Sequence, residues 1–211
     1  MKSNRREQSA DRWRAIIKKN YVTMSLAPPE ILSSDFCASI VAVNADALQY
    51  VPKSVLNYTI CLVAVRHSGR ALKYVPAKFK EPEICELAIR SDPRALQYVP
   101  ESVKTPYLCN LAVSHDIRAF PYVPDHLKTA AMCKNVVMQD GIMLKHIPAQ
   151  LQSDDICSAA VHENEGAIKY IQNKSSKLFS FEALSQSAQN CAEQRNNQFT
   201  NHTRGDIDYE R

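Results

Sequence analysis

We predict an all-α fold for this chain: a right-handed α-solenoid of about six 24-residue helical repeats with N- and C-terminal capping helices. Three residue types recur along most of the sequence with the same step of 24 residues. A fixed period in the twenties is typical of repeat proteins, in which each unit buries its apolar face only by stacking on its neighbours. The recurring residues are Cys37, Cys61, Cys85, Cys109, Cys133 and Cys157; Tyr50, Tyr74, Tyr98, Tyr122 and Tyr170; and Pro52, Pro76, Pro100, Pro124 and Pro148.

Residues 81–104 indicate what one repeat contains. Pro82 suits the first position of a helix, because its missing N–H costs no hydrogen bond there, and this helix is expected to end near Arg90. Asp92 suits the N-cap of a second helix of about two turns, which stops before Pro100. Pro100 then opens a third, single turn. The short polar cap recurs as Asn44, Ser68, Asp92, Asp116, Asp140 and Asn164.

The same period divides the chain into four segments. Residues 1–24 are predicted to form a basic N-terminal capping helix, with Trp13 at the cysteine position, and residues 25–176 the array of repeats. Residues 177–195 are expected to form a C-terminal capping helix that contains the off-pattern Cys191. The polar residues 196–211 are expected to be disordered. In the capping helix at the N-terminus we expect four basic side chains to face water: Arg12, Arg14, Lys18 and Lys19.

Repeats four and five depart from the pattern. Pro121 falls inside the second helix of repeat four and is expected to kink or shorten it. In repeat five, His146 replaces the tyrosine and Met143 a small alanine, with Met132 and Met138 nearby. These methionines suggest either a core that has drifted or a deformable contact surface.

The recurring cysteines are interpreted as small buried residues rather than disulfides or zinc ligands. Equivalent atoms in stacked helical layers lie roughly 8–10 Å apart, beyond the Cα separation that a disulfide spans, and the cysteines lack the paired close spacing of a zinc site. No apolar run has transmembrane length, and the N-terminus lacks the hydrophobic segment of a secretory signal. We therefore expect a cytoplasmic protein.

The charge distribution argues against nucleic-acid binding. Residues 1–24 hold seven Lys and Arg against two acids, residues 25–176 hold fifteen against fifteen, and residues 177–211 hold four against five. A nucleic-acid-binding array is expected to carry its excess of positive charge on the repeats. The basic first helix offers an alternative function, attachment to an anionic membrane or another polyanion.

The candidate site is a column of arginines in the loops between the first two helices of each repeat. Arg70, Arg94 and Arg118 occupy equivalent positions, and Arg66, His67, Arg90 and His115 flank them. They are either solvated residues beside the capping acids or a basic ridge that binds an acidic protein segment or phosphate groups. A second column, Lys80, Lys104 and Lys128, is explained by favourable interaction with a helix C-terminus. No catalytic, cofactor-binding or metal-binding motif is present.

The stretch EIC-x-LAI…ALQYVPESVKTP resembles a repeat family known as domain of unknown function 4116, over about residues 30–175. Such repeats occur in bacterial proteins, including effectors that Legionella-type bacteria inject into host cells through type IV secretion. The resemblance implies helical repeats and delivery into a host cell without a cleavable signal peptide, and hence a role in virulence. It implies no activity, because the family has no assigned catalytic residues.

We therefore expect a non-catalytic helical-repeat module for protein–protein interaction, either a bacterial effector or a regulator of an effector or host protein. Two alternatives remain open. One is the binding of an anionic membrane or polyanion through the first helix. The other is an enzyme centred on the irregular repeats four and five, since catalysis needs unlike residues in one place.

Overall fold

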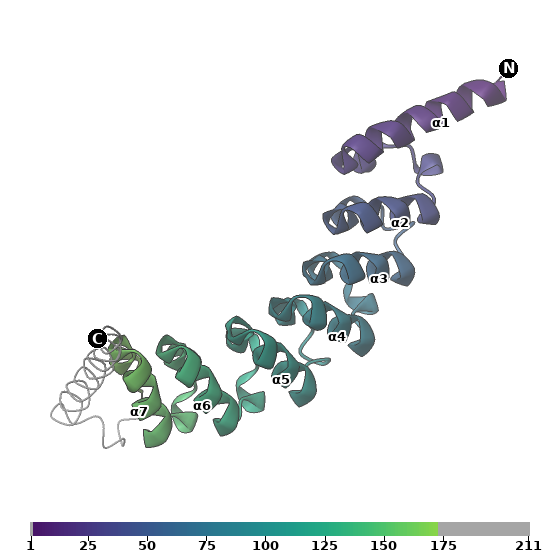
Figure 1. The fold of residues 1–211 in the computed structure, drawn as a ribbon. Helices are drawn as coiled ribbons and strands as arrows, with labels where there is room; N and C mark the ends of the chain where they lie inside the picture. The colour runs from purple at the N-terminus through teal and green to yellow at the C-terminus, as the bar shows by residue number, and fades with distance from the viewer. Residues whose placement is uncertain (1, 173–211) are drawn as a thin grey trace, which may run out of the picture. The chain divides into compact units, whose positions relative to one another are not determined.

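The computed structural model describes residues 2–172, with side chains from residue 9 onward, and these residues form helices and no strands (Figure 1). Ten-residue α-helices alternate with short 3-10 helices, and the starts of α2 to α7 lie 24 residues apart. The α-helices are α1 (Lys2–Lys19), α2 (Ser34–Val43), α3 (Tyr58–His67), α4 (Pro82–Ser91), α5 (Pro106–His115), α6 (Ala130–Gln139) and α7 (Asp154–Glu163). The 3-10 helices are η1 (Tyr21–Leu26), η2 (Pro29–Ile31), η3 (Ala45–Tyr50), η4 (Gly69–Tyr74), η5 (Ala77–Phe79), η6 (Pro93–Tyr98), η7 (Ile117–Tyr122), η8 (Asp125–Leu127), η9 (Gly141–His146), η10 (Ala149–Leu151) and η11 (Glu165–Tyr170).

The chain divides into two compact units, the first ending at Val123 and the second beginning at Pro124. In the first unit, α2 packs on α3, α3 on α4 and α4 on α5, and the 3-10 helices η3, η4, η6 and η7 pack on one another in the same order. In the second unit, α6 packs on α7 and η9 on η11. Each unit is therefore a stack of layers in which one α-helix and one six-residue 3-10 helix recur. This confirms the predicted packing of repeated helices.

The local sequence explains where each helix begins. Pro82 and Pro106 stand at the first position of α4 and α5, and the Thr105 hydroxyl accepts a hydrogen bond from Leu108 N, as predicted. The polar residue after each of α2 to α7 is the N-cap of the following 3-10 helix, and its side chain caps a backbone N–H in every case except Ser68. At that position Gly69 N donates instead to Ser91 Oγ of the next layer, at 3.1 Å.

The second helix of each repeat is a 3-10 helix, whereas the sequence had suggested an α-helical repeat throughout. It has six residues, and the residue before the following proline is extended, with Val99 at φ −76° and ψ 128°. A segment this short gains few hydrogen bonds from either helix type, so the tighter 3-10 form is accessible. The predicted third turn follows the proline as η5, η8 and η10, or as a simple turn.

The prediction for Pro121 is wrong: η7 contains this proline and keeps the same six-residue length as η4 and η6. The clash expected of proline is with the carbonyl four residues earlier in an α-helix, whereas the hydrogen bonds of a 3-10 helix join residues three apart. Pro121 therefore removes only its own N–H donor. The bonds on either side remain, from Ala119 N to Asp116 O at 2.9 Å and from Val123 N to Phe120 O at 3.1 Å. The 3-10 helix η7 is therefore not shortened, and it packs on η6 as η6 packs on η4.

The cysteine column lies in the core, as predicted. All six recurring cysteines are buried and free, and each lies on an α-helix beside apolar residues of the same face, such as Ile84 and Ala88 around Cys85. Burial raises the pKa of Cys61, Cys85, Cys109, Cys133 and Cys157 to about 11, and that of Cys37 in the same direction. These thiols therefore stay protonated and weakly nucleophilic at neutral pH.

The N-terminal helix α1 packs on the 3-10 helices η1 and η2, and only a narrow strip of α1 and η1 is buried. Ile17 and Met24 are fully buried, Trp13 is half-buried, and Ile16 and Leu26 are exposed although they fall on apolar columns of the pattern. The four basic residues predicted to face water, Arg12, Arg14, Lys18 and Lys19, are exposed. The predicted capping helix at residues 177–195, Cys191 and the predicted disordered segment 196–211 lie outside the described residues.

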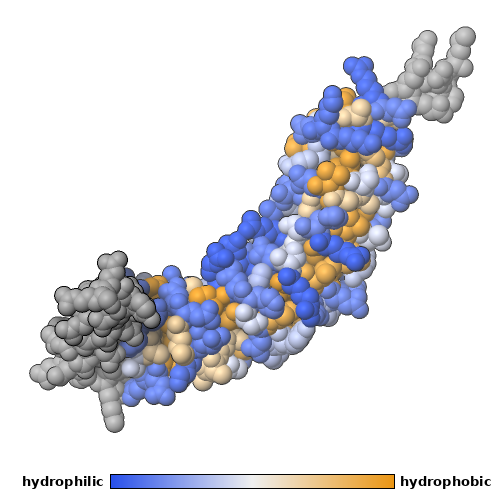
Figure 2. All heavy atoms as spheres, viewed as in Figure 1, coloured by the Kyte–Doolittle hydropathy of each residue, from blue (hydrophilic) through white to orange (hydrophobic). Residues whose placement is uncertain are grey.

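Hydrophobic residues reach the surface between hydrophilic ones on the face shown in Figure 2. The large apolar side chains with the most exposure are Val43, at 88 %, Leu26, at 75 %, and Met138, at 60 %. Among the described helices, none combines the length and the hydropathy that crossing a membrane requires.

Candidate functional site

The predicted arginine column lies at the N-terminal ends of the 3-10 helices η4, η6 and η7. We call Arg70, Arg94 and Arg118 the arginine edge. Asp92 caps η6 by accepting from Arg94 N at 3.0 Å, and its other oxygen accepts from Arg70 Nε of the preceding layer at 2.8 Å. Arg94 Nε lies 3.8 Å from the first oxygen of the same carboxylate. One capping aspartate thus fixes the spacing of two arginines in successive layers.

Arg118 is held by the cap of its own 3-10 helix. Its Nε donates to both carboxylate oxygens of Asp116, at 2.9 and 3.1 Å, and the hydrogen bond lowers the pKa of that carboxyl. The side chains of Arg70, Arg94 and Arg118 remain 63 %, 36 % and 66 % exposed. Within the described residues, Arg70 and Arg118 use Nε for these bonds and make none through the two terminal nitrogens. Since both side chains are exposed, those nitrogens can bind an anionic group.

A polar hollow of about 300 Å³ opens along the arginine edge. Its lining carries three basic side chains against one acid, so the hollow attracts negative charge. Lys73 lies at its margin with its ammonium 4.4 Å from the centre of the Tyr74 ring. The lining residues are Arg70, Lys73, Asp92, Arg94, Gln97, Tyr98 and Tyr122.

The four flanking residues of the prediction lie at the C-terminal ends of α-helices instead of on the edge. Arg90 belongs to a network on α4 and α5, in which it donates to Glu86 at 2.8 Å and to the Tyr107 hydroxyl at 3.0 Å. The hydrogen bond from Arg90 is the main cause that lowers the pKa of Glu86. Arg66 and His67 are exposed at the end of α3, and His115 Nδ1 lies 2.8 Å from Leu111 O at the end of α5.

The lysine column has a role that the sequence did not reveal. The ammonium groups donate across layers to the carbonyl 18 residues later, which ends the 3-10 helix of the next repeat: Lys80 to Tyr98 O at 2.8 Å, Lys104 to Tyr122 O at 3.0 Å and Lys128 to His146 O at 2.7 Å. We call this interaction the lysine clasp. The sequence predicted that each lysine interacts with the C-terminus of the turn that contains it. In the structure each lysine interacts with the C-terminus of the 3-10 helix in the next repeat instead.

The clasp residues are mostly buried, so their charge needs compensation. The side chains of Lys104 and Lys128 are 8 % and 6 % exposed, and they pair with Glu101 at 2.9 Å and with Asp125 at 2.8 Å. Lys80 has alanine three residues before it, and burial lowers its pKa. In the last described layer Gln152 replaces lysine and donates to Tyr170 O at 3.2 Å.

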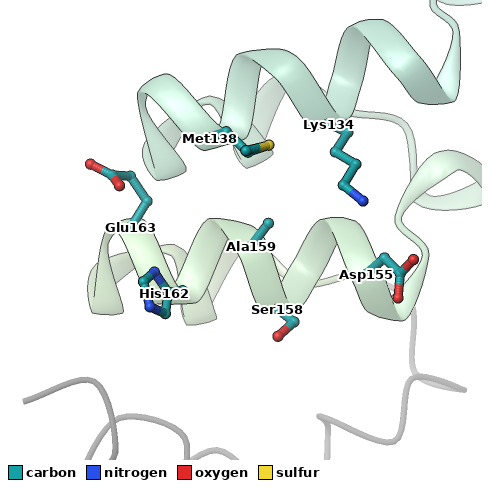
Figure 3. Close-up of a pocket in the computed structure, with 7 residues that line it drawn as sticks. All are labelled: Lys134, Met138, Asp155, Ser158, Ala159, His162 and Glu163. Carbon is teal, nitrogen blue, oxygen red and sulfur yellow. The ribbon is translucent and has the colours of Figure 1, made fainter. Parts of the chain in front are cut away.

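The irregular repeats contain a different surface feature. A wide hollow of about 500 Å³ lies between α6 and α7 (Figure 3), lined by Lys134, Met138, Asp155, Ser158, Ala159, His162 and Glu163. Lys134 and Met138 of α6 point towards α7, whereas Ser158 points away from α6.

The methionines of the irregular repeats differ in burial: Met132 is buried and Met138 is exposed. His146 is half-buried, and burial is the first cause that lowers its pKa. The polar groups do not converge on one point, and the enzyme alternative stays a prediction.

A search for metal-binding geometry gives a similar result for the described part of the chain. Residues 9–172 contain no group of three or more His, Cys, Asp or Glu side chains that could hold a metal ion. His67 and His115, which share a column, stand at the ends of different α-helices two layers apart. The membrane alternative likewise stays a prediction, since the exposed basic residues of α1 fit it without testing it.

The sequence of two consecutive repeats matches a known family model. Residues 57–104 match the family model described as Domain of unknown function (DUF4116). The match spans two periods of 24 residues and confirms the predicted resemblance over this stretch. No curated protein and no solved structure matches the chain. The DUF4116 stretch contains Arg70, Asp92, Arg94 and the clasp lysines Lys80 and Lys104, whereas Arg118 lies beyond it.

Proposed function

We propose that this protein is a non-catalytic helical-repeat module that binds an acidic segment of a protein partner along the arginine edge. The observation that supports it is the recurrence of Arg70, Arg94 and Arg118 at one position of successive layers, each beside a capping aspartate. The side chains of Arg70 and Arg118 are exposed and that of Arg94 is half-buried. An arginine that is already fixed loses less side-chain entropy when it binds a carboxylate. The proposal includes a right-handed solenoid of about six repeats as the scaffold.

The spacing of the edge indicates what the acidic segment looks like. Helical layers lie roughly 8–10 Å apart, and an extended chain advances about 3.3 Å per residue. An extended segment with Asp or Glu at every third residue therefore presents one carboxylate to each arginine. Lys73 adds positive charge beside Arg70, which favours such a segment over a basic one.

The proposed cellular role is supported by the family match alone. We propose that the protein acts as a bacterial effector, or as a regulator of an effector or of a host protein, and meets its partner in the cytoplasm. The support is the DUF4116 match at residues 57–104 together with the presence of such repeats in injected bacterial proteins.

Charge reversal of the edge tests the proposed binding. We expect Arg70→Glu, Arg94→Glu and Arg118→Glu together to abolish capture of a stoichiometric partner from host or bacterial lysate, as measured by affinity purification and quantitative mass spectrometry. The triple variant removes three cations and adds three anions that repel an acidic segment, so a loss of at least tenfold is expected.

The matched control reverses three exposed lysines of the second unit, Lys134→Glu, Lys145→Glu and Lys169→Glu, which changes the net charge by the same amount. This control should capture the partner as the unmodified protein does. The proposal fails if no stoichiometric partner is recovered, or if the two triple variants behave alike. Circular dichroism confirms that both remain helical.

A further inference from the structure

The lysine clasp is missing at two positions of the first unit, where leucine replaces lysine. Leu56 stands 24 residues before Lys80, at the position from which a clasp would reach the carbonyl of Tyr74, 18 residues later. Among the hydrogen bonds of residues 9–172, no side chain donates to Tyr74 O. Leu32, one repeat earlier, also replaces lysine, but it is only 3 % exposed. Leu56 is half-buried, so of these two leucines it is the one that replaces a clasp lysine at the surface.

A groove of about 450 Å³ opens beside Leu56, a volume in the range of ligand-binding pockets. Its walls come from two successive layers, and apolar side chains predominate. We call it the leucine groove, and its lining residues are Leu48, Gln49, Val51, Lys53, Leu56, Tyr74, Pro76, Lys78 and Phe79. In the next repeat the equivalent position holds Lys80, which spans the interface to Tyr98 O. The groove and the absence of the clasp thus occur together.

The floor of the groove is held in place by aromatic contacts. The Phe79 ring lies 6.4 Å from the Tyr58 ring in an edge-to-face arrangement with an interplanar angle of 70°. Tyr74 contacts the ammonium of Lys73 at 4.4 Å on its other side. An apolar side chain that enters the groove therefore meets surfaces that are already ordered, which reduces the entropic cost of binding.

The two charged residues that line the groove are basic. Lys53 and Lys78 are exposed and line it, no acidic residue does so, and Lys78 Nζ lies 4.6 Å from the centre of the Phe79 ring. A basic margin around an apolar floor complements a ligand with a large apolar group between negative charges. Tyr74 O adds an acceptor for a backbone N–H of that ligand, in the place that the clasp takes in other layers.

We propose that the leucine groove binds a protein segment in which one large apolar side chain is flanked by Asp or Glu. The apolar side chain occupies the floor formed by Leu56 and Phe79, and the flanking carboxylates pair with Lys53 and Lys78. This inference shares with the proposed function the premise of a protein ligand, but it rests on other residues than the arginine edge. Leucine at position 56 leaves open an interface that lysine closes elsewhere.

The test selects random 12-residue peptides displayed on phage against the full chain, with Leu56→Lys as the comparison protein. The new lysine is expected to donate to Tyr74 O and to lie across the groove, as Lys80 does one layer later without an acid three residues before it. Enriched peptides should carry Leu, Phe, Trp or Met between acidic residues. In fluorescence anisotropy, the fluorescein-labelled peptides should bind Leu56→Lys at least tenfold more weakly than the unmodified protein.

Two further variants keep the test decisive. Lys53→Glu with Lys78→Glu should also weaken these peptides at least tenfold, whereas Lys134→Glu with Lys169→Glu, of equal charge, should not. If Leu56→Lys fails to fold, as judged by its melting temperature, the lysine pair decides. Peptides that bind Leu56→Lys as tightly as the unmodified protein, or that are basic, would overturn the proposal. The triple arginine-edge variant should retain the peptides, so the two proposals can fail separately.

Discussion

Replacing Gln152 by Glu is expected to destabilise the protein by at least about 3 kcal/mol. Gln152 is 1 % exposed, its amide nitrogen donates to Ile147 O at 3.0 Å and Tyr170 O at 3.2 Å, and its oxygen accepts from Gln172 N at 2.7 Å. Glutamate has nearly the same shape but presents a buried negative charge to backbone carbonyl oxygens. Urea unfolding at pH 7, followed by circular dichroism, measures the loss.

The loss should depend on pH in a defined direction. Burial beside carbonyls raises the pKa of the new carboxyl above its value of about 4.3 in the unfolded chain. The destabilisation should therefore be small below about pH 4, where both states are protonated, and grow as pH rises through the folded-state pKa. Gln152→Lys is the matched control, because Lys128 occupies the equivalent position and reaches His146 O. Equal stability losses for the two variants at pH 7 would contradict this account.

Gly69→Ala is expected to cost about 1–3 kcal/mol or more, although alanine is a common residue in helical segments. A Cβ on Gly69 would lie 2.2 Å from Ala88 O and 2.9 Å from Asp92 N, both backbone atoms of the next layer. Among the described residues no glycine has a positive φ, so the requirement comes from close approach and not from backbone conformation. The layers would have to separate, which a fall in melting temperature would reveal.

Gly166→Ala provides the comparison. It stands four repeats later in the neighbouring column, and its added Cβ would meet the Asn164 side chain at 3.0 Å and Ile142 Cδ1 at 3.7 Å. Side-chain ends can move, and alanine also lowers the entropy of the unfolded chain. We expect a change of less than about 1 kcal/mol. A loss at Gly166 as large as that at Gly69 would show that glycine is needed for a reason other than the contact between layers.

The local features of the fold were predictable because short stretches of sequence determine them. The N-caps such as Asp92 and the first-turn proline Pro106 act within three residues, and the buried cysteines follow from the period. The helix type of the second segment was not predictable in the same way, because both types satisfy the same cap and proline. The 3-10 form of this segment also explains why Pro121 is tolerated, because the expected clash arises in an α-helix.

The candidate site was predictable only as a column. Equal spacing identified Arg70, Arg94 and Arg118, but Asp92 was interpreted as a cap alone and not as the link between two arginines. The lysine clasp joins residues 18 positions apart in different layers, a relation that depends on how the layers stack. The leucine groove lies at an interface that lacks that clasp, so leucine at position 56 acquires a meaning only once the clasp is known.

The central claim is that equal spacing in the sequence means equal layers in space. Pulsed electron paramagnetic resonance can test it with spin labels on the exposed positions that end α2, α3 and α5. The two pairs are His67→Cys with His115→Cys and Val43→Cys with His115→Cys, in a Cys191→Ser background. The buried recurring cysteines should not react with the label under native conditions. For layers roughly 8–10 Å apart, we predict about 16–20 Å for the first pair and about 24–30 Å for the second. A second distance equal to or shorter than the first would contradict stacked layers.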